Sequence, residues 1–318
     1  MINEGIWLAL VCFTAVKQNK NRPTPAEGKL RSLLSLNQIE YDDLLTVFSP
    51  LISEKLSHYT PKGQMRLFPL EEESSLSSLY GSKTKLDFIL TYLKENPNQC
   101  YHGEMFEMSQ SKVSEWVSYL LPVLEASLIK MKVMPQSGYR YIQTDKEVDY
   151  LLVDVTERQV VRDVDPDNQQ EFYSGKKKLH TMKNLAITDQ DGYIEFISES
   201  YMGSVHDKVI WDQIEIEMKD HNLLADLGFV GIEKGCPNAI LPYKKPRGKE
   251  LTELQKQINK AIGSARIRVE HAFSGVKRLK IIRNKIRLKT YQVRDQVFKI
   301  AAALHNLRVS YRTIQLQP

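Results

Sequence analysis

Apolar residues in the first 135 positions recur at helical spacing. They do so over 37–56 and again over 85–128, which predicts helices in both segments. The intervening stretch 59–83 is richer in Pro, Gly and Ser and predicts a loop. Within 85–128, Pro97 ends the first helical piece, and a serine of "SQS" (109–111) supplies an N-cap for the last. This part of the chain is therefore predicted to be helical.

The end of this helical part has the order helix, turn, capped helix. DNA-binding proteins use that order to place the last helix in the major groove, although small helical bundles share it. The pattern alone leaves both interpretations open. The candidate groove-facing residues are Ser111, Lys112, Ser114 and Glu115. Lys112 is the one basic side chain among these four, so the charge of this helix adds little to the case for DNA binding.

After Pro135 the pattern changes to short apolar runs that predict strands. The predicted elements are strands at 147–160, 177–188 and 192–200, a helix at 206–220, strands at 222–231 and 239–245, and helices at 250–287 and 291–310. This order is that of an α/β fold with a ribonuclease-H-like mixed sheet. In that topology the first strand is central, and the crossover helix returns the fourth strand beside it as a parallel neighbour.

Charge is distributed unevenly over the 318 residues. From Tyr243 to Arg312 the chain has 19 Lys and Arg against 4 acids, a net charge of +15, so the remainder carries −10 of the overall +5. Clustered Lys and Arg gain affinity for a polyanion by releasing counterions from its phosphates. The distribution indicates a C-terminal part that faces nucleic acid, with a solvated helical surface as the ordinary alternative.

The remaining composition excludes several classes of protein. The hydrophobic and charged fractions, 42% and 26%, are near globular averages and argue against disorder, a coiled coil or collagen. Cys12, Cys100 and Cys236 lie far apart, which supports neither a disulfide framework nor a zinc ribbon and indicates a reducing compartment. The longest apolar run, Ile6–Val16, is too short to span a bilayer and is predicted to be a buried element.

Two of the predicted strands end on an aspartate. Asp154 closes the first strand and Asp226 the fourth, so the predicted topology brings both carboxylates to one edge of the sheet. Two close carboxylates repel unless one is protonated or a cation lies between them. Hard oxygen ligands favour Mg²⁺ or Mn²⁺. Asp207 competes with Asp226 for the second position, but it starts a predicted helix, where an acid is stabilised without any catalytic role.

A third acid stands in the helical stretch "ARIRVEHAFSGVKR" (265–278), in which Glu270 is the single carboxylate. A salt bridge to Arg266, one turn away, is the ordinary explanation. Alternatively, Glu270 completes a site for two metal ions roughly 3.5–4 Å apart, which activates water for phosphodiester cleavage. On a continuous helix Arg266 and Lys277 would then flank it on one face as phosphate-binding cations.

Other residues near these carboxylates are candidates for supporting roles. Glu157 and His206 would lie close to the metal site, although an exposed acid and a structural histidine are the ordinary interpretations. Lys176 and Lys177 are candidates for contacts with the DNA backbone, and a solvated turn is the alternative.

Six motifs occur in one order along the chain: "VDVTERQ" (153–159), "YSGKKKLHTMK" (173–183), "GSVHD" (203–207), "ADLGFVG" (225–231), "RIRVEHAFSGVKR" (266–278) and "ALHNLR" (303–308). Together they resemble the DDE-superfamily insertion-sequence transposases of the IS-five group and the related Harbinger-type transposases. The resemblance covers about 85–312. It implies a helical region, 1–135, whose helix-turn-helix segment (about 85–128) binds DNA, and a ribonuclease-H-like catalytic domain, 145–312.

The resemblance also implies site residues. The catalytic and metal-binding carboxylates of the family fall on Asp154, Asp226 and Glu270, with two Mg²⁺ or Mn²⁺ ions as cofactors. The arginine and lysine of the family's Y-x2-R-x3-E-x6-K signature fall on Arg266 and Lys277. The tyrosine of that signature falls on Gly263, which departs from the pattern.

The activity implied by the resemblance is transposition. Such an enzyme hydrolyses a DNA strand at each terminal inverted repeat and uses the freed 3′-OH to attack target DNA. Its partners would be DNA and further copies of itself in a homo-oligomer, without a membrane, in the cytoplasm and associated with the nucleoid. Two alternatives are a non-catalytic or domesticated DNA-binding regulator and a general ribonuclease-H-like nuclease, which would cut without preference for element ends.

Overall fold

The computed structural model describes residues 25–75, 77–138, 148–214, 216, 221–288 and 290–314. The chain forms two compact units. The sheet unit contains Pro135–Gly275, and the helical unit combines Arg22–Met134 with Val276–Leu316. The apolar run at 6–16, predicted to be buried, lies outside the described residues.

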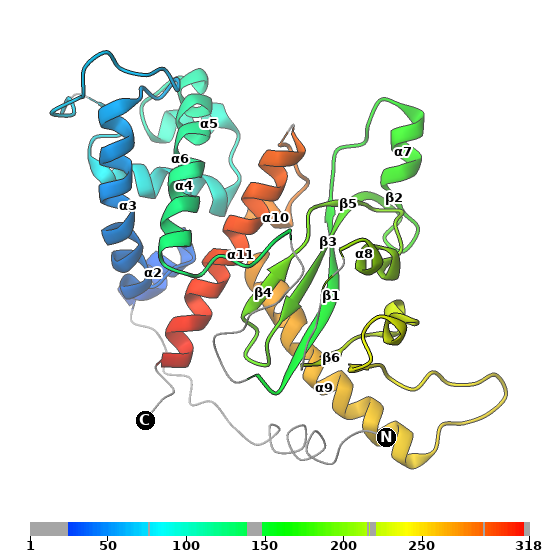
Figure 1. The fold of residues 1–318 in the computed structure, drawn as a ribbon. Helices are drawn as coiled ribbons and strands as arrows, with labels where there is room; N and C mark the ends of the chain where they lie inside the picture. The colour runs from blue at the N-terminus through cyan, green and yellow to red at the C-terminus, as the bar shows by residue number, and fades with distance from the viewer. Residues whose placement is uncertain are drawn as a thin grey trace. The chain divides into compact units, whose positions relative to one another are not determined.

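The sheet unit is built on a seven-stranded mixed sheet (Figure 1). Its strands are β1 (Tyr150–Gln159), β2 (Tyr173–Ser174), β3 (Leu179–Thr188), β4 (Ile194–Ile197), β5 (Tyr201–Met202), β6 (Asn222–Leu224) and β7 (Ala239–Ile240). The order is β2-β3-β1-β6-β7, and β4 and β5 also pair with β3. β1 is central, antiparallel to β3 and parallel to β6, so the predicted position of the first and fourth strands is confirmed.

Helices cover both faces of this sheet. The helices of the sheet unit are α7 (Pro166–Phe172), α8 (Asp207–Ile214) and α9 (Glu253–Val276), with 3₁₀ turns η2 (Leu227–Phe229) and η3 (Ile232–Lys234). Leu151 and Val153 of β1 join a fully buried core with Ile210 and Trp211 of α8 and with Phe229. Successive strand residues point to opposite faces, so Leu152 and Asp154 face the other side. Figure 1 draws α8 in front of the strands and α9 behind them.

Several predicted boundaries differ from the observed ones. β6 stops at Leu224, since Asp226 already caps η2. The long helix predicted over 250–287 ends at Val276, and Lys277 and Arg278 form a turn before α10 (Lys280–Arg283). Lys277 therefore lies beyond the helix that carries Arg266 and Glu270, and the predicted single helical face for all three is wrong. Helix α7 and the short strands β2 and β5 were not predicted.

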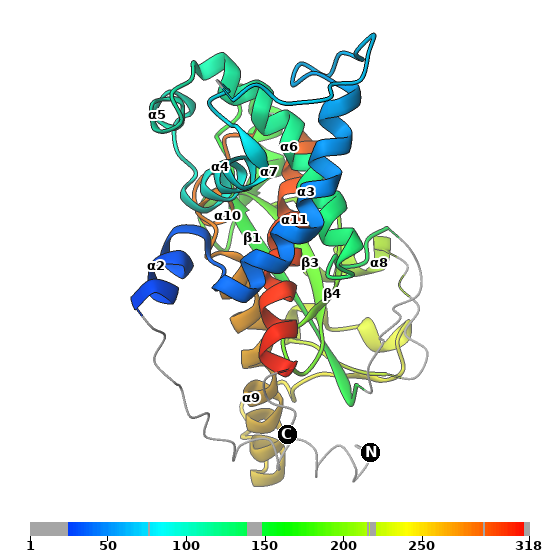
Figure 2. The same ribbon diagram turned by 90° about the vertical axis from the view of Figure 1, so that its left-hand side faces the viewer.

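The helical unit contains the predicted helices. They are α3 (Gln38–His58), α4 (Gly81–Glu95), α5 (Gln99–Met105), α6 (Gln110–Lys130), α10 and α11 (Tyr291–Ile314). A further helix of this unit, α2 (Pro25–Leu34), was not predicted. Asn37 begins α3 with a capping box in which its side chain and that of Glu40 each accept the other's backbone N–H. Helices α3, α4 and α6 pack against one another around fully buried Phe48, Phe88 and Leu120 (Figure 2).

A tight turn joins α5 to α6. Ser109 caps α6 as predicted, accepting from the Lys112 N–H at 3.4 Å. Within α5, a Cβ added to Gly103 would lie only 2.3 Å from the Met108 carbonyl oxygen. The turn thus packs its backbone directly against a glycine of the preceding helix, which explains why that helix position lacks a side chain.

The C-terminal helices complete the helical unit. Helix α10 packs on α4, and α11 packs on α6 and α3. Buried Asn306 of α11 donates to the Val133 carbonyl, and Gln296 donates to Glu125 of α6 at 2.7 Å. Compact packing therefore groups 276–316 with the N-terminal helices, whereas the sequence places residues up to 312 in one domain with the strands.

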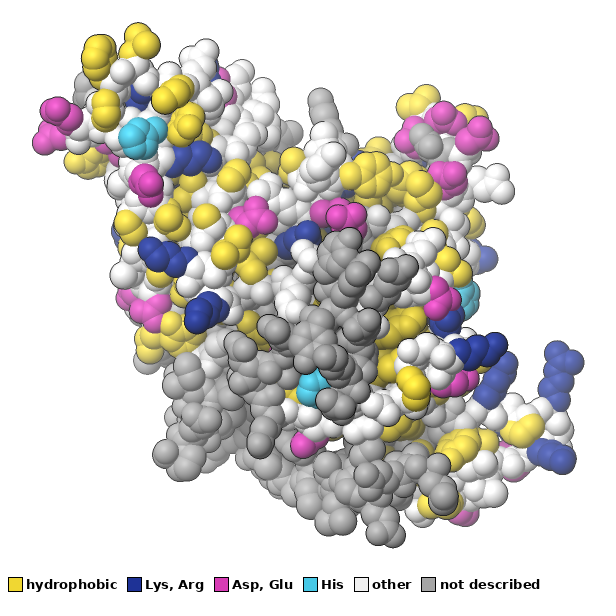
Figure 3. Space-filling model, viewed as in Figure 1, with side chains coloured by type: hydrophobic (Ala, Val, Ile, Leu, Met, Phe, Trp, Pro, Cys, Tyr) yellow, Lys and Arg dark blue, Asp and Glu magenta, His cyan; other side chains and the backbone are white. Residues whose placement is uncertain are grey.

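The surface of the helical unit has one notable apolar segment, the connection between α3 and α4. Met65, Leu67 and Phe68 expose 76%, 94% and 82% of their surface, although the segment is anchored by the Tyr59–Met65 bridge. Hydrophobic side chains gather at the upper left of Figure 3, where this connection lies. Among the described helices, none is long and apolar enough to cross a bilayer.

Candidate active site

Asp154 and Asp226 become neighbours through strand register. Leu152 of β1 pairs with Leu224 of β6, and the two strands run in parallel. Each aspartate follows its leucine by two residues, so both carboxylates emerge at the same end of the central strand pair. The Asp226 side chain also accepts from the Gly228 N–H at 2.7 Å, which fixes it as the N-cap of η2. The predicted convergence of these two aspartates is observed.

Arg266 of α9 joins the two carboxylates. Its Nη2 atom lies 3.8 Å from Asp154 Oδ1 and 3.5 Å from Asp226 Oδ2. The Arg266 side chain is 19% exposed, and its Nε atom is a buried donor that finds no hydrogen-bond partner among the described residues. A buried donor without a partner is costly. The guanidinium therefore keeps unused capacity to bind an anion.

Burial controls the protonation of Asp154. The pKa of this carboxyl is raised from 3.8 to about 6, mainly by loss of solvent and to a smaller extent by the negative charges of Asp226 and Asp207. The Val155 N–H, which donates to Asp154 Oδ1 at 2.9 Å, and Arg266 act in the opposite direction. Ionisation of Asp154 is thus energetically unfavourable in the folded protein, and a bound cation would reduce this cost.

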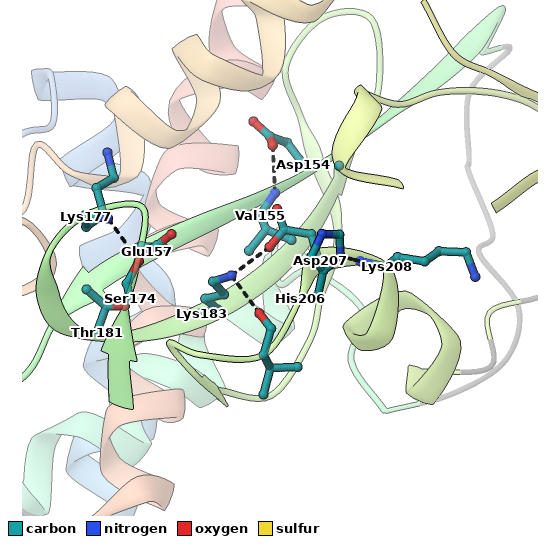
Figure 4. Close-up of polar contacts among 12 residues, drawn as sticks. Asp154, Val155, Glu157, Ser174, Lys177, Thr181, Lys183, His206, Asp207 and Lys208 are labelled. Carbon is teal, nitrogen blue, oxygen red and sulfur yellow. Dashed lines mark hydrogen bonds and ion pairs between the residues drawn. The ribbon is translucent and has the colours of Figure 1, made fainter. Parts of the chain in front are cut away.

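Asp207 lies beside this pair but already has a cation of its own. Lys183, buried within β3, donates to Asp207 Oδ1 at 3.0 Å and to the Val205 carbonyl at 2.7 Å (Figure 4). A Cβ added to Gly228 would lie 2.8 Å from Asp226 Oδ1 and 3.4 Å from Asp207 Oδ2. Glycine at 228 therefore keeps space for two carboxylates that approach the same point.

The third predicted carboxylate does not join this pair. Glu270 is on α9, one turn after Arg266, and its side chain is exposed. Across the described ranges, no group of three His, Cys, Asp or Glu side chains is close enough to hold a metal ion. The ordinary alternative, a salt bridge between Glu270 and Arg266, is also not observed among the described residues, where the ion pairs of Arg266 are with the two aspartates.

The supporting candidates are placed separately. Glu157 points to the face of β1 opposite to Asp154 and accepts from Thr181 Oγ1 at 3.0 Å (Figure 4). His206 is exposed before α8, where its Nδ1 accepts from the Lys208 N–H at 3.4 Å. Lys176 and Lys177 are exposed in the turn between β2 and β3.

In the helical unit, the Lys112 side chain is exposed and pairs with Glu115 Oε2 at 3.0 Å. Sequence reasoning missed two residues of the sheet unit, Lys183 and Gly228. A lysine in the middle of a predicted strand was the available signal for Lys183. No signal beyond the glycine itself indicated Gly228, since its role depends on how the Asp226 and Asp207 side chains approach each other in the fold.

The geometry has a counterpart among known proteins. Residues 153–306 match the family model described as DDE superfamily endonuclease. This region belongs to the DDE superfamily. The match begins one residue before Asp154 and runs through Asp226, Arg266 and Glu270 into α11. The superfamily predicted from the six motifs is thereby confirmed.

A curated relative extends this comparison. Over 200 residues the chain is 26% identical to a protein of Microchaete diplosiphon described as a probable transposase for insertion sequence element IS702. The alignment covers 63% of this chain and 71% of that protein. No solved structure matches the chain.

DDE-superfamily endonucleases generally use divalent metal ions, so the DDE region can be tested for its fit to such an ion. Asp154 Oδ1 and Asp226 Oδ2 face one guanidinium nitrogen, so two hard oxygen donors already point to one cation. Mg²⁺ is often held by one or two carboxylates together with water and substrate phosphates, without a full protein cage. The aspartate pair fits Mg²⁺ or Mn²⁺ in this way.

Proposed function

We propose that the chain is a DNA transposase that cuts a strand at each terminal inverted repeat of its element and joins the end to target DNA. One observation carries this proposal: Asp154 and Asp226, far apart in sequence, meet around Arg266 inside the DDE region. The relative's description as a probable transposase supports the same activity. The strand order, with β1 central and β6 parallel to it, supports a ribonuclease-H-like fold.

Two phosphodiester reactions follow from this proposal. In the first, water attacks a phosphorus atom at the element end, and the bond to the 3′ oxygen breaks to leave a 3′-OH. In the second, that 3′-OH attacks a target phosphorus and displaces a target 3′ oxygen. Bound divalent ions supply activation of the nucleophile and stabilisation of the leaving oxygen in such reactions.

The chain's own residues have separate tasks in this scheme. Asp154 and Asp226 hold the cation site, and Glu270 is proposed as a further ligand that is exposed before DNA binds. Arg266 has a donor without a partner and would bind the phosphate that replaces its present carboxylate contacts. Asp226 is preferred to Asp207 as the second ligand because Asp207 is already neutralised by Lys183.

The proposed DNA contacts of the helical unit involve α5 and α6. Their order of helix, tight turn and Ser109-capped helix is that of a helix-turn-helix, whose second helix would read the terminal repeats. We further propose that copies of the chain assemble to bring two element ends together.

The decisive test is strand cleavage with Mg²⁺ of a duplex that carries the inverted repeat found in the DNA flanking the coding region. We expect a nick at the repeat end in the wild type and a loss of at least about 100-fold in Asp154→Asn and Asp226→Asn. Glu270→Gln tests the third ligand separately. Equal cleavage by wild type and both aspartate variants would refute the catalytic assignment, and DNA binding without cleavage would favour the regulator.

A further inference from the structure

The stretch from Lys277 to Arg294 has an extreme charge. It contains eight Lys and Arg and no Asp or Glu. Helix α10 and the loop that follows it lie within this stretch, and α10 packs on α4 of the helical unit. This positively charged stretch therefore belongs to the unit that contains α5 and α6, although it follows the DDE carboxylates in sequence.

Part of this charge has a structural task at the C-terminal end of α4. Arg287 Nη2 donates to the Asn96 carbonyl at 2.5 Å and to the Pro97 carbonyl at 2.8 Å. Lys280 forms an ion pair with Glu95. Cations at a helix C-terminus satisfy free carbonyl groups and interact favourably with the helix dipole. Stabilisation of α4 accounts for these two side chains.

Three other cations are not used in this way. Arg278, Arg283 and Lys285 are exposed, and no acidic side chain of the described residues lies within ion-pair distance of them. Arg278 also lies near further positive groups. Burial is the main cause that lowers the pKa of Lys94, and the charges of Arg308, Lys280 and Arg278 lower it further, against the opposing charge of Glu95. Holding like charges together without acids is unfavourable unless an external anion neutralises them.

The helix proposed to read DNA lacks such cations. The exposed side chains at the start of α6 are uncharged apart from Lys112, which already pairs with Glu115. In protein–DNA complexes, contacts to phosphates supply most of the affinity and fix the orientation, whereas base contacts supply specificity. A helical unit that binds DNA through α6 therefore needs its phosphate contacts from another segment.

We propose that Arg278, Arg283 and Lys285 form a phosphate-binding surface of the helical unit that holds the backbone of duplex DNA. This inference rests on the proposed function and assigns one of its DNA contacts to exposed residues of the helical unit. Helix α4 supports the surface, because its last residues are bonded to Arg287, Lys280 and the Arg278 carbonyl, to which Lys94 Nζ donates at 3.1 Å.

Binding of the full-length protein to a fluorescent duplex of random sequence, followed by anisotropy in EDTA at several salt concentrations, tests this surface. EDTA prevents cleavage, so the result does not depend on catalysis. We expect the triple variant Arg278→Gln, Arg283→Gln, Lys285→Gln to lose at least about tenfold in affinity. The slope of log affinity against log salt should fall by up to about 3, since each phosphate contact contributes about 0.9.

Two controls make the result specific. The variant Lys62→Gln, Lys83→Gln, Lys130→Gln removes the same charge from exposed positions elsewhere in the helical unit and should bind within about threefold of wild type. The charge-preserving variant Arg278→Lys, Arg283→Lys, Lys285→Arg should keep the wild-type slope. Equal losses of affinity in the two Gln variants, or no loss in the first, would refute the assignment of Arg278, Arg283 and Lys285 as a phosphate-binding surface. Strand cleavage by the wild type, which tests the proposed transposase activity, would be unaffected by that result.

Discussion

At the scale of single residues, Asp154 shows how a catalytic candidate weakens the fold that contains it. Its side chain is 20% exposed and lies beside Arg266 of α9, and loss of solvent is the main cause that raises its pKa from 3.8 to about 6. Between pH 3.8 and about pH 6, Asp154 is therefore largely protonated in the folded state but largely ionised in the unfolded state. Stability falls as the pH rises through this window, because the buried side chain must then ionise.

Asp154→Asn should remove this penalty, since the amide keeps the shape and the acceptor for the Val155 N–H without carrying charge. Relative to wild type in EDTA, the free energy of unfolding of the variant should rise by about 2 kcal/mol from about pH 4.5 to about pH 8. Denaturant unfolding at both pH values measures the difference. A difference that stays constant with pH would show that Asp154 titrates normally.

Gly228 gives a second prediction at this scale. An added Cβ would press on Asp226 Oδ1 at 2.8 Å and reach Asp207 Oδ2 at 3.4 Å. Gly228→Ala should therefore lower strand cleavage by at least about tenfold by displacing the Asp226 carboxylate, while its cost in stability stays near about 1 kcal/mol.

Gly235→Ala is the matched control for this change. A Cβ there meets nothing within 4 Å, and Gly235 lies close by in the chain, after η3. Cleavage rates of both variants should be compared with their thermal midpoints. If Gly228→Ala cleaves like Gly235→Ala, the position of Asp226 does not depend on the glycine.

At the scale of elements, the turn between α5 and α6 carries the clearest constraint. Alanine normally stabilises a helix relative to glycine by up to about 1 kcal/mol. In α5 the opposite is expected, because the new Cβ of Gly103→Ala would lie 2.3 Å from the Met108 carbonyl oxygen. We expect a loss of about 1–3 kcal/mol in the free energy of unfolding.

Gly263→Ala in α9 tests the same exchange without the clash. Nothing lies within 4 Å of a Cβ at this helical position, so this variant should be slightly stabilised. Thermal unfolding of the two proteins side by side separates helix propensity from packing. Stabilisation by both substitutions would mean that the α5–α6 turn is looser than the structure shows.

Periodicity predicted most elements, for a physical reason. A helix such as α3 buries one stripe of apolar residues, and the first four residues of the central strand β1 are apolar on both faces. The pattern of apolar residues therefore predicts which side chains are buried. The predicted element ends were wrong where tertiary contacts determine where a strand or helix stops. The strand predicted over 222–231 ends at Leu224 because Asp226 caps a 3₁₀ turn, and the helix over 265–278 ends at Val276 although its residues favour continuation.

The candidate site was predictable to a similar extent. Strand order and the positions of the two aspartates after apolar strand residues were sufficient to place Asp154 beside Asp226. The prediction that Asp154 closes its strand was wrong, because β1 continues to Gln159 in its pairing with β3. The partner of this pair was not predictable, because the sequence offered Glu270 on the same helix as the ordinary ionic partner of Arg266, or DNA phosphate as its target. Arg266 instead reaches across to the sheet. Periodicity predicts which face of a helix a residue lies on, but it does not predict which of several nearby charged groups a long side chain will pair with.

At the scale of the whole molecule, the chain completes its helical unit late. Arg22–Met134 is made first, but α10 and α11 follow the entire sheet unit. Val297, Phe298, Leu304 and Leu307 of α11 are at most 2% exposed. Each such side chain contributes about 1.5–3 kcal/mol when buried. Together they approach the whole stability of a typical domain, about 5–15 kcal/mol.

A fragment of residues 22–134 should therefore lack a stable fold, even though it contains all the helices of the proposed helix-turn-helix. We expect it to unfold without a cooperative transition in circular dichroism, and to regain one when co-expressed with residues 276–316. A fragment that melts cooperatively on its own would show that the N-terminal helices fold stably without α11. If residues 276–316 are required, the proposed DNA-binding helices and the residues that follow the DDE carboxylates form one folding unit. Cutting the chain at residue 135 would then not yield a separate DNA-binding domain and a separate catalytic domain.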